Sequence, residues 1–321
     1  MAHFIGKKVQ AWAGIIRLPN LLILVLIQLL VWFCVIRSIY DVYGTGLQLH
    51  PWIFVLLMIS TVCIAAGGYM INDLQDTDID RINRKLRNKV GEILNPATVW
   101  KIYLLLNAIA TAMGFIISVK TGSFQMGLIF PAISGLLWFY STRYKTMLFW
   151  GNLIIAILGA LVILIVWLFE FMALRNSPDL YLEVYRGLER INALVWSIAL
   201  FAFLMTLLRE WIKDVQDMIG DERYGSRSLP VILGMKGMKP ILILTGVIII
   251  LLLALAQIKL WQWGLRYTMI YLLITVQPLM IYLLVLLGKA AKPENMRSAS
   301  NLAKIIMLAG ILSMELICLD L

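Results

Sequence analysis

The chain has 321 residues, of which 61% are hydrophobic and only 14% are charged. A soluble globular domain is about half apolar and about one quarter charged, so this composition indicates an integral membrane protein. The formal net charge of +10 does not indicate a nucleic-acid partner, because the Lys and Arg residues lie between hydrophobic segments rather than in one cluster.

Nine apolar segments of bilayer-spanning length predict an all-α, polytopic membrane protein. In chain order they are Leu18–Ile36, Trp52–Ile71, Val99–Val119, Phe124–Tyr140, Leu148–Phe169, Ile191–Ile212, Ile241–Ile258, Tyr267–Leu287 and Leu302–Ile317. Three local features accompany them. Glu170 is expected to reach the outer interface, the stretch Met172–Arg190 predicts a short interfacial helix, and Pro278 predicts a kink.

The distribution of positive charge predicts the orientation of these segments. Most of the 28 Lys and Arg residues fall on the side that holds the N-terminus. Since loops on the cytoplasmic side of a membrane carry the excess of Lys and Arg, the N-terminus is expected in the cytoplasm. An odd number of spans then places the C-terminus outside, in a protein of the cytoplasmic or inner membrane with membrane lipids around it.

Carboxylates cluster where two of the apolar segments end. Asp73, Asp76 and Asp80 follow the second segment at positions i, i+3 and i+7, which share one face of a helix. Acidic residues at the mouth of a membrane helix are costly and are usually functional. The same spacing returns after the sixth segment, at Asp214, Asp217 and Asp221. One such cluster is most often solvated surface, but two of matching spacing on the same predicted side indicate a shared role.

The chemistry of these clusters points to magnesium and a phosphorylated substrate. Carboxylate oxygens suit Mg²⁺, which is usually shared between protein carboxylates and substrate phosphates. Arg81, Arg209 and Lys213 lie near the two clusters and are candidate partners for phosphate oxygens. Gly67 and Gly68, just before the first cluster, allow either close approach of a substrate or tight helix packing.

Four sequence patterns resemble those of the UbiA superfamily of intramembrane prenyltransferases. They are Arg17-Leu18-Pro19-Asn20, then Asn72, Asp73, Asp76 and Asp80, then Tyr140-Ser141 with Lys145 and Gly151-Asn152, and lastly the run from Arg209 to Asp221 with Ser228-Leu229-Pro230. They occur in family order over most of the chain, and nine helices is the family number.

The resemblance implies a fold, a cofactor and a donor. It implies nine helices bundled around a central cavity, in a single prenyltransferase domain over residues 1–321, and a polyprenyl diphosphate donor. It implies that Mg²⁺ and the diphosphate are held by Asp73, Asp76, Asp80, Asp214, Asp217 and Asp221, with Asn72 in support. The implied substrate-binding residues are Arg17, Asn20, Arg81, Tyr140, Lys145, Arg209 and Lys213.

The acceptor and two other kinds of protein stay open at this point. The second signature most resembles the branch that adds geranylgeranyl to geranylgeranylglyceryl phosphate, and an aromatic acceptor such as a quinone precursor is the alternative. A CDP-alcohol phosphotransferase is disfavoured because its D-G-x-x-A-R run is absent. A transporter with acidic gates would place its acids near the middle of the membrane rather than at one rim.

Overall fold

The structure is a computed structural model that describes residues 2–75, 89–144, 147, 149–223 and 228–321. These residues form helices and no β-strand, and nine helical segments among them are long and apolar enough to cross a membrane. The all-α, nine-span prediction is therefore confirmed. The elements are α1 Ala2–Ile15, α2 Leu18–Leu30, η1 Val31–Arg37, α3 Ser38–Val42, α4 Pro51–Gln75, α6 Lys89–Glu92, α7 Pro96–Lys120, η2 Phe124–Leu128, α8 Ile129–Thr142, α9 Trp150–Arg175, α10 Pro178–Arg223, α11 Leu229–Gln262, α12 Arg266–Tyr271, η4 Leu272–Val276, α13 Gln277–Lys289, η5 Pro293–Asn295 and α14 Met296–Asp320.

The chain forms two compact units. Unit 1 comprises Met1–Gln28, Gln48–Tyr144 and Leu168–Pro178. Unit 2 comprises Leu29–Leu47, Lys145–Trp167 and Asp179–Leu321. Each unit therefore contains one of the two acidic clusters that the sequence singles out.

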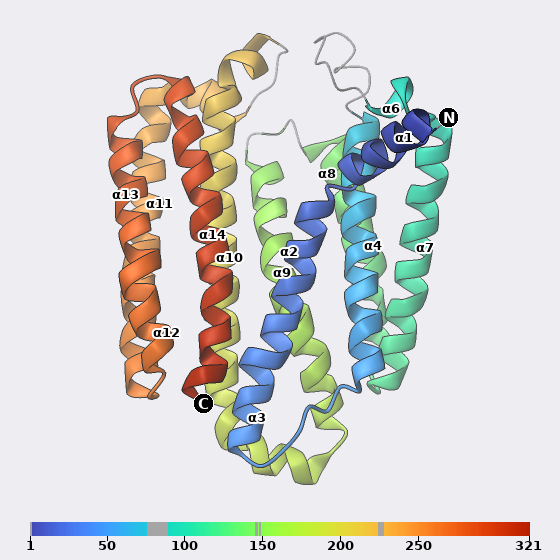
Figure 1. The fold of residues 1–321 in the computed structure, drawn as a ribbon, viewed down its shortest axis with the longest axis vertical. Helices are drawn as coiled ribbons and strands as arrows, with labels where there is room; N and C mark the ends of the chain where they lie inside the picture. Colours follow the sequence, from blue (N-terminus) through green and yellow to red (C-terminus); the bar gives the residue numbers. More distant parts are fainter. Residues whose placement is uncertain (1, 76–88, 145–146, 148, 224–227) are drawn as a thin grey trace. The chain divides into compact units, whose positions relative to one another are not determined.

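Unit 1 is built on the close packing of α4 against α7, which lie side by side in Figure 1. The buried Ser60 hydroxyl of α4 donates a hydrogen bond of 2.9 Å to the carbonyl of Ala110 in α7. Gly114 of α7 lets the Phe130 ring of α8 approach, since a Cβ at this glycine would lie 2.2 Å from Cδ2 of the ring. Small residues at helix contacts allow such approach in membrane proteins.

Glu170 is buried in unit 1, and the prediction that it reaches the interface is wrong. Its Oε1 accepts a hydrogen bond of 2.6 Å from the backbone N–H of Gln48, and Oε2 accepts one of 3.3 Å from that of Leu49. These two N–H groups precede α4, where they have no partner within a helix. A buried carboxylate is tolerated when such donors satisfy it.

Unit 2 packs α11, α13 and α14 together and ties α9 to α10. The indole Nε1 of Trp167 donates a hydrogen bond of 2.8 Å to Oδ1 of Asn192. Pro278 stands at the start of α13, directly after the π-helical turn η4. A proline inside a membrane helix removes one backbone donor, and a wider π turn is a common local response. The structure thus shows a wider turn directly before Pro278, and the kink expected there stays a prediction.

The expected interfacial helix is not a separate element. Its residues from Pro178 onward are the first turns of α10, which continues as one helix to Arg223. The apolar positions at helical spacing in this stretch are therefore correctly assigned to a helix, but its C-terminal boundary is wrong.

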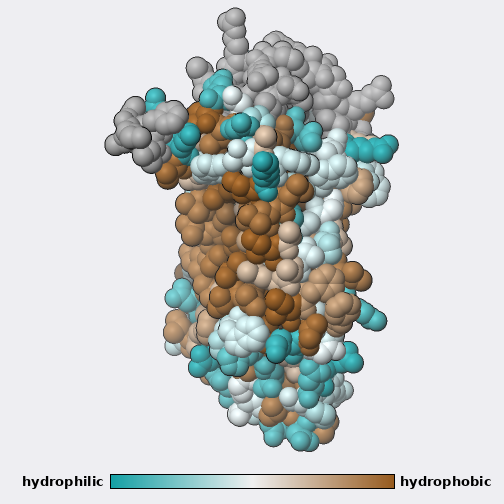
Figure 2. Space-filling model, turned by 90° about the vertical axis from the view of Figure 1, so that its right-hand side faces the viewer, coloured by the Kyte–Doolittle hydropathy of each residue, from teal (hydrophilic) through white to brown (hydrophobic). Residues whose placement is uncertain are grey.

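The surface of the protein agrees with a place in the bilayer. Figure 2 shows a hydrophobic band across the middle of the face in view, with hydrophilic residues bordering it. Large exposed residues between the charged ends of α7, such as Leu104, Leu105 and Ile116, are apolar. An exposed apolar surface of this kind is expected where hydrocarbon chains take the place of water.

Candidate functional site

The first part of the site lies in unit 1, where α1 ends. Ala11 and Ile15 of α1 pack against Met70 of α4 and Val99 of α7, so the chain leaves α1 beside the end of α4. Arg17 connects α1 to α2 with a φ of 51°, and it is the only non-glycine residue with positive φ among the described residues. This conformation is rarely adopted by an L residue, and such outliers gather at functional sites.

Arg17 lies beside Asp73, the first member of the first acidic cluster. Its guanidinium lies 4.7 Å from the centroid of the Tyr69 ring, and its Nη2 lies 3.9 Å from Oδ1 of Asp73. Asn20, one turn into α2, donates a hydrogen bond of 3.3 Å from Nδ2 to the Tyr69 hydroxyl. The structure therefore brings the predicted residues Arg17, Asn20 and Asp73 together.

Tyr69 is a member of this group that the sequence reading missed. It precedes Asp73 by four residues in α4, so the two side chains share a helix face. Because the Arg17 and Asp73 side chains are 45% and 29% exposed, their pair adds at most about 1 kcal/mol to stability. The arrangement places the Arg17 guanidinium next to the Asp73 carboxylate. The guanidinium has further N–H groups that can donate hydrogen bonds to phosphate oxygens.

The other predicted residues of this part fall into two groups. Tyr140 and Asn72 are partly buried in α8 and α4, both in unit 1. The remaining members of the first cluster and its basic neighbours lie outside the described residues; they are Asp76, Asp80, Arg81 and Lys145.

Gly67 and Gly68 serve helix packing in the structure. A Cβ at Gly68 would lie 2.9 Å from Cδ1 of Leu137 in α8, and one at Gly67 would lie 2.7 Å from Nδ2 of Asn107 in α7. Neighbouring helices therefore occupy the space over both glycines. Of the two readings of this pair, the contacts favour tight packing over approach of a substrate.

The second part of the site lies in unit 2, on α10. Asp214, Asp217 and Asp221 all belong to this one helix, so their spacing does place them along a single face. Nδ2 of Asn152, near the start of α9, donates a hydrogen bond of 2.6 Å to Oδ2 of Asp214. Asn152 belongs to one of the patterns that resemble the UbiA superfamily, but the sequence alone does not show that it contacts Asp214.

The basic residues of this part differ in their surroundings. Arg209 forms an ion pair with its neighbour Glu210, while Lys213 and Asp217 are exposed. Trp211 is buried and packs against Phe149, with ring centroids 6.1 Å apart. This packing fixes the face of α10 that turns inward and leaves Lys213 and Asp217 on its open face. The side chain of Asp221 lies outside the described residues.

The donor atoms of the site suit magnesium. Asp73, Asp214 and Asp217 offer carboxylate oxygens, the hard ligands that Mg²⁺ takes together with water and phosphate. Within the described residues no group of three or more His, Cys, Asp or Glu side chains stands ready to hold a metal. The side chains of Asp76, Asp80 and Asp221 are not among those residues.

A family sequence model and several known proteins match this chain. The sequence model of the UbiA prenyltransferase family matches residues 30–306. A digeranylgeranylglyceryl phosphate synthase of Methanosphaera stadtmanae is 30% identical over 266 residues, covering 80% of this chain and 86% of the relative. One of Thermococcus gammatolerans is 32% identical over 182 residues, and the match spans 57% of this chain and 56% of that protein.

Comparison with solved structures agrees on the fold. A structure from work on digeranylgeranylglyceryl phosphate synthase superimposes with a TM-score of 0.66 at 22% identity, over 98% of this chain and all of that one. A UbiA homologue from Archaeoglobus fulgidus bound to GPP and Mg²⁺ gives a TM-score of 0.50 at 16% identity, over 91% of this chain and 98% of that one. At these identities the likeness concerns the fold alone.

Proposed function

Because this chain belongs to the UbiA prenyltransferase family and is a membrane-embedded prenyltransferase, we propose that it transfers geranylgeranyl from its diphosphate to geranylgeranylglyceryl phosphate. The observation that carries the proposal is the pair of carboxylates at membrane-helix ends, each with a defined partner. Asp214 accepts a hydrogen bond from Asn152, and Asp73 lies beside Arg17. The relatives named digeranylgeranylglyceryl phosphate synthase support this donor and this acceptor.

The proposal requires both units to act as one domain over residues 1–321. The cluster of Asp73, Asp76 and Asp80 and the cluster of Asp214, Asp217 and Asp221 would then hold the same diphosphate. Mg²⁺ bound there would neutralise the negative charge that develops on the diphosphate as it leaves. GPP and Mg²⁺ bound to the Archaeoglobus fulgidus homologue support a prenyl diphosphate and magnesium as the partners of these carboxylates.

The residues of the chain have distinct tasks in this reaction. Arg17 and Lys213 donate hydrogen bonds to diphosphate oxygens. The other proposed donors to these oxygens are Arg81, Lys145 and Arg209. Asn152 holds Asp214 in one orientation, and Asn72, Asn20 and Tyr140 support the donor side. Pre-positioned charge of this kind lowers the barrier to departure of a negative leaving group.

The bonds exchanged follow from the two substrates. The bond between C1 of the prenyl chain and the diphosphate oxygen breaks, and the electron pair leaves with the diphosphate. The free hydroxyl oxygen of geranylgeranylglyceryl phosphate forms the new bond to C1, and its proton passes to water. The apolar interior of a membrane protein shields the allylic cation from hydrolysis while this happens.

The orientation of the enzyme completes the proposal. The excess of Lys and Arg on the side of the N-terminus supports a cytoplasmic N-terminus. Both acidic clusters then face the cytoplasm, where a water-soluble diphosphate head group can reach them. The C-terminus lies on the other side of the membrane.

Purified protein supplied with radiolabelled geranylgeranyl diphosphate and Mg²⁺ tests the proposal. Geranylgeranylglyceryl phosphate is expected to take up label, while 4-hydroxybenzoate and homogentisate are not. If only an aromatic acceptor took up label, the protein would instead be a prenyltransferase of aromatic acceptors. Asp76→Ala and Asp217→Ala are each expected to reduce product to background, and full turnover in both variants would refute the role given to the clusters.

A further inference from the structure

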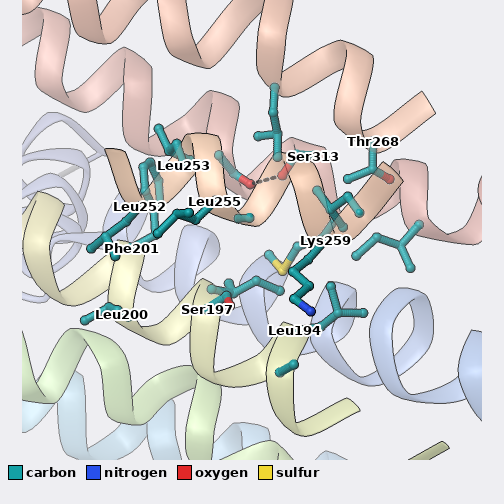
Figure 3. A pocket seen from close by; sticks show the side chains of 18 of the residues that line it. Leu194, Ser197, Leu200, Phe201, Leu252, Leu253, Leu255, Lys259, Thr268 and Ser313 are labelled. Atoms are coloured by element: carbon teal, nitrogen blue, oxygen red, sulfur yellow. Dashed lines mark hydrogen bonds between the residues drawn. The ribbon is translucent and has the colours of Figure 1, made fainter. Parts of the chain in front are cut away.

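Unit 2 contains a cavity of about 290 Å³ that the proposed reaction does not use. It lies between α10, α11 and α14, and Thr268 and Leu272 also line it. Its volume is close to the lower limit of the ~300–1,000 Å³ typical of small-molecule sites. Figure 3 shows the side chains of α10 and α11 that face it.

The walls of the cavity are apolar, and two of its polar side chains are already engaged. Leucines are the commonest lining residues, and Phe201 and other apolar residues join them. The Ser313 hydroxyl donates to the carbonyl of Gly310 at 2.7 Å, and the Thr268 hydroxyl donates to Asp320 at 2.7 Å. Such a surface favours hydrocarbon over any ligand with polar groups along its length.

Lys259 is the one ionisable residue that lines this cavity within the described chain. Figure 3 shows its side chain extending toward the wall formed by Leu194 and Ser197. It is exposed, and it has no hydrogen bond or ion pair with another described residue. A lone ammonium group at the edge of an apolar cavity is complementary to a ligand with an anionic head and a hydrocarbon tail.

A second cation lies next to this end of the cavity. Arg190 lines a small neighbouring cavity, which shares Leu194 and Trp263 with the larger one. Arg190 likewise has no ion pair with the described residues. Lys259 and Arg190 thus bring two positive charges to this end of unit 2, while the Asp320 carboxylate beside Thr268 is already engaged by the Thr268 hydroxyl and by the backbone N–H groups of Tyr267 and Thr268.

The cavity is remote from the carboxylates of α10. Leu194 and Asp214 belong to the same continuous helix, and their separation along it is about 30 Å at ~1.5 Å per residue. This length equals the ~30 Å thickness of the hydrocarbon core of a bilayer. A head group at Lys259 therefore belongs to the membrane leaflet opposite the one that holds the head group at Asp214.

We propose that this cavity binds one hydrocarbon chain of an anionic membrane phospholipid, with the lipid phosphate paired to Lys259. The side of the cavity toward Leu200 and Leu255, which are 44% and 60% exposed, gives the chain its entry. The bound lipid fills the space between α10, α11 and α14 and stabilises unit 2 from the leaflet opposite the acidic cluster. It is neither donor nor acceptor in the prenyl transfer.

Thermal unfolding of the full-length protein in neutral detergent tests this site, because a ligand that binds the folded state raises the unfolding temperature in a saturable way. Dioleoyl phosphatidylglycerol is the anionic probe, and dioleoyl phosphatidylcholine is the zwitterionic comparison. Phosphatidylglycerol is expected to give the larger, saturable increase. Lys259→Gln is expected to weaken its apparent affinity about fivefold, the effect of one basic residue on an anionic lipid.

Two further variants separate the cavity from general charge. Lys236→Gln removes an exposed lysine elsewhere on α11 and is expected to leave the affinity unchanged. Ala256→Phe fills the cavity while keeping Lys259, and it is expected to abolish the increase. Equal effects of the two lipids, or unchanged affinity in Lys259→Gln, would overturn the proposal. Displacement of phosphatidylglycerol by a geranylgeranyl thiolodiphosphate would also overturn it, since the cavity would then hold the tail of the donor.

Discussion

Replacing Asn152 with alanine removes the contact that orients Asp214 and leaves the carboxylate itself in place. The hydrogen bond from Asn152 Nδ2 to Asp214 Oδ2 is 2.6 Å long, at the short end for a charge-assisted bond. A hydrogen bond to a charged group contributes about 1.5–3 kcal/mol. Without it, Asp214 is expected to sample other rotamers and, in its proposed role, to hold Mg²⁺ less well.

The size of the effect follows from the behaviour of residues that support metal ligands. Their loss reduces metal affinity or activity by about 10–100-fold. Asn152→Ala is therefore expected to raise the Mg²⁺ concentration for half-maximal prenyl transfer by about 10–100-fold. The rate at saturating Mg²⁺ should fall much less, because all six aspartates of the two clusters remain.

The assay is a Mg²⁺ titration of prenyl transfer with labelled donor, at fixed saturating concentrations of both substrates. Asn107→Ala is the matched control, because the Asn107 amide of α7 donates to the carbonyl of Tyr103 in its own helix and touches no carboxylate in the described structure. Its Mg²⁺ requirement should equal that of the unchanged protein.

Two results would contradict the reasoning about Asn152. One is an unchanged Mg²⁺ requirement in Asn152→Ala. The other is an equally large increase in the Mg²⁺ requirement when Asn152→Ala is introduced into an Asp214→Asn background, where the hydrogen-bonded carboxylate is already gone. The double-mutant cycle isolates the coupling between the two side chains.

Three other perturbations test separate parts of the account. Chelation of divalent metal should reduce prenyl transfer to background, and added Mg²⁺ should restore it; activity that survives chelation would contradict metal dependence. Arg17→Gln should raise KM for the donor by about 10–100-fold, because a charged hydrogen bond to the donor is lost. The control Arg37→Gln removes only an exposed ion pair with Asp41 and should leave KM unchanged. Gly114→Ala should destabilise the protein by about 1–3 kcal/mol through collision with Phe130, while Gly135→Ala, with no atom within 4 Å of the new Cβ, should not lower the unfolding temperature.

Features that depend on local periodicity could be predicted from the sequence. The nine spans are visible as apolar runs, and the structure places a helix on each of them. The common helix of Asp214, Asp217 and Asp221 follows from spacing alone. At Pro278, where the sequence predicts a kink, the structure has a wider π-helical turn directly before the proline.

Features that depend on contacts between distant segments could not be predicted in this way. The partner of Asp214 is Asn152, which lies 62 residues away in the chain. Tyr69 resembles any aromatic residue of a membrane helix until Arg17 and Asn20 are seen beside it. Glu170 resembles an interfacial acid because its backbone donors lie 122 and 121 residues away, before α4.

The central claim is that the carboxylates of α4 and α10 hold one diphosphate between them. A density map of the protein with Mg²⁺ and a non-reactive geranylgeranyl thiolodiphosphate measures this directly. The account predicts that Asp73 and Asp214 both lie within metal-ligand reach of the same diphosphate. A diphosphate bound by only one of the two clusters would contradict it.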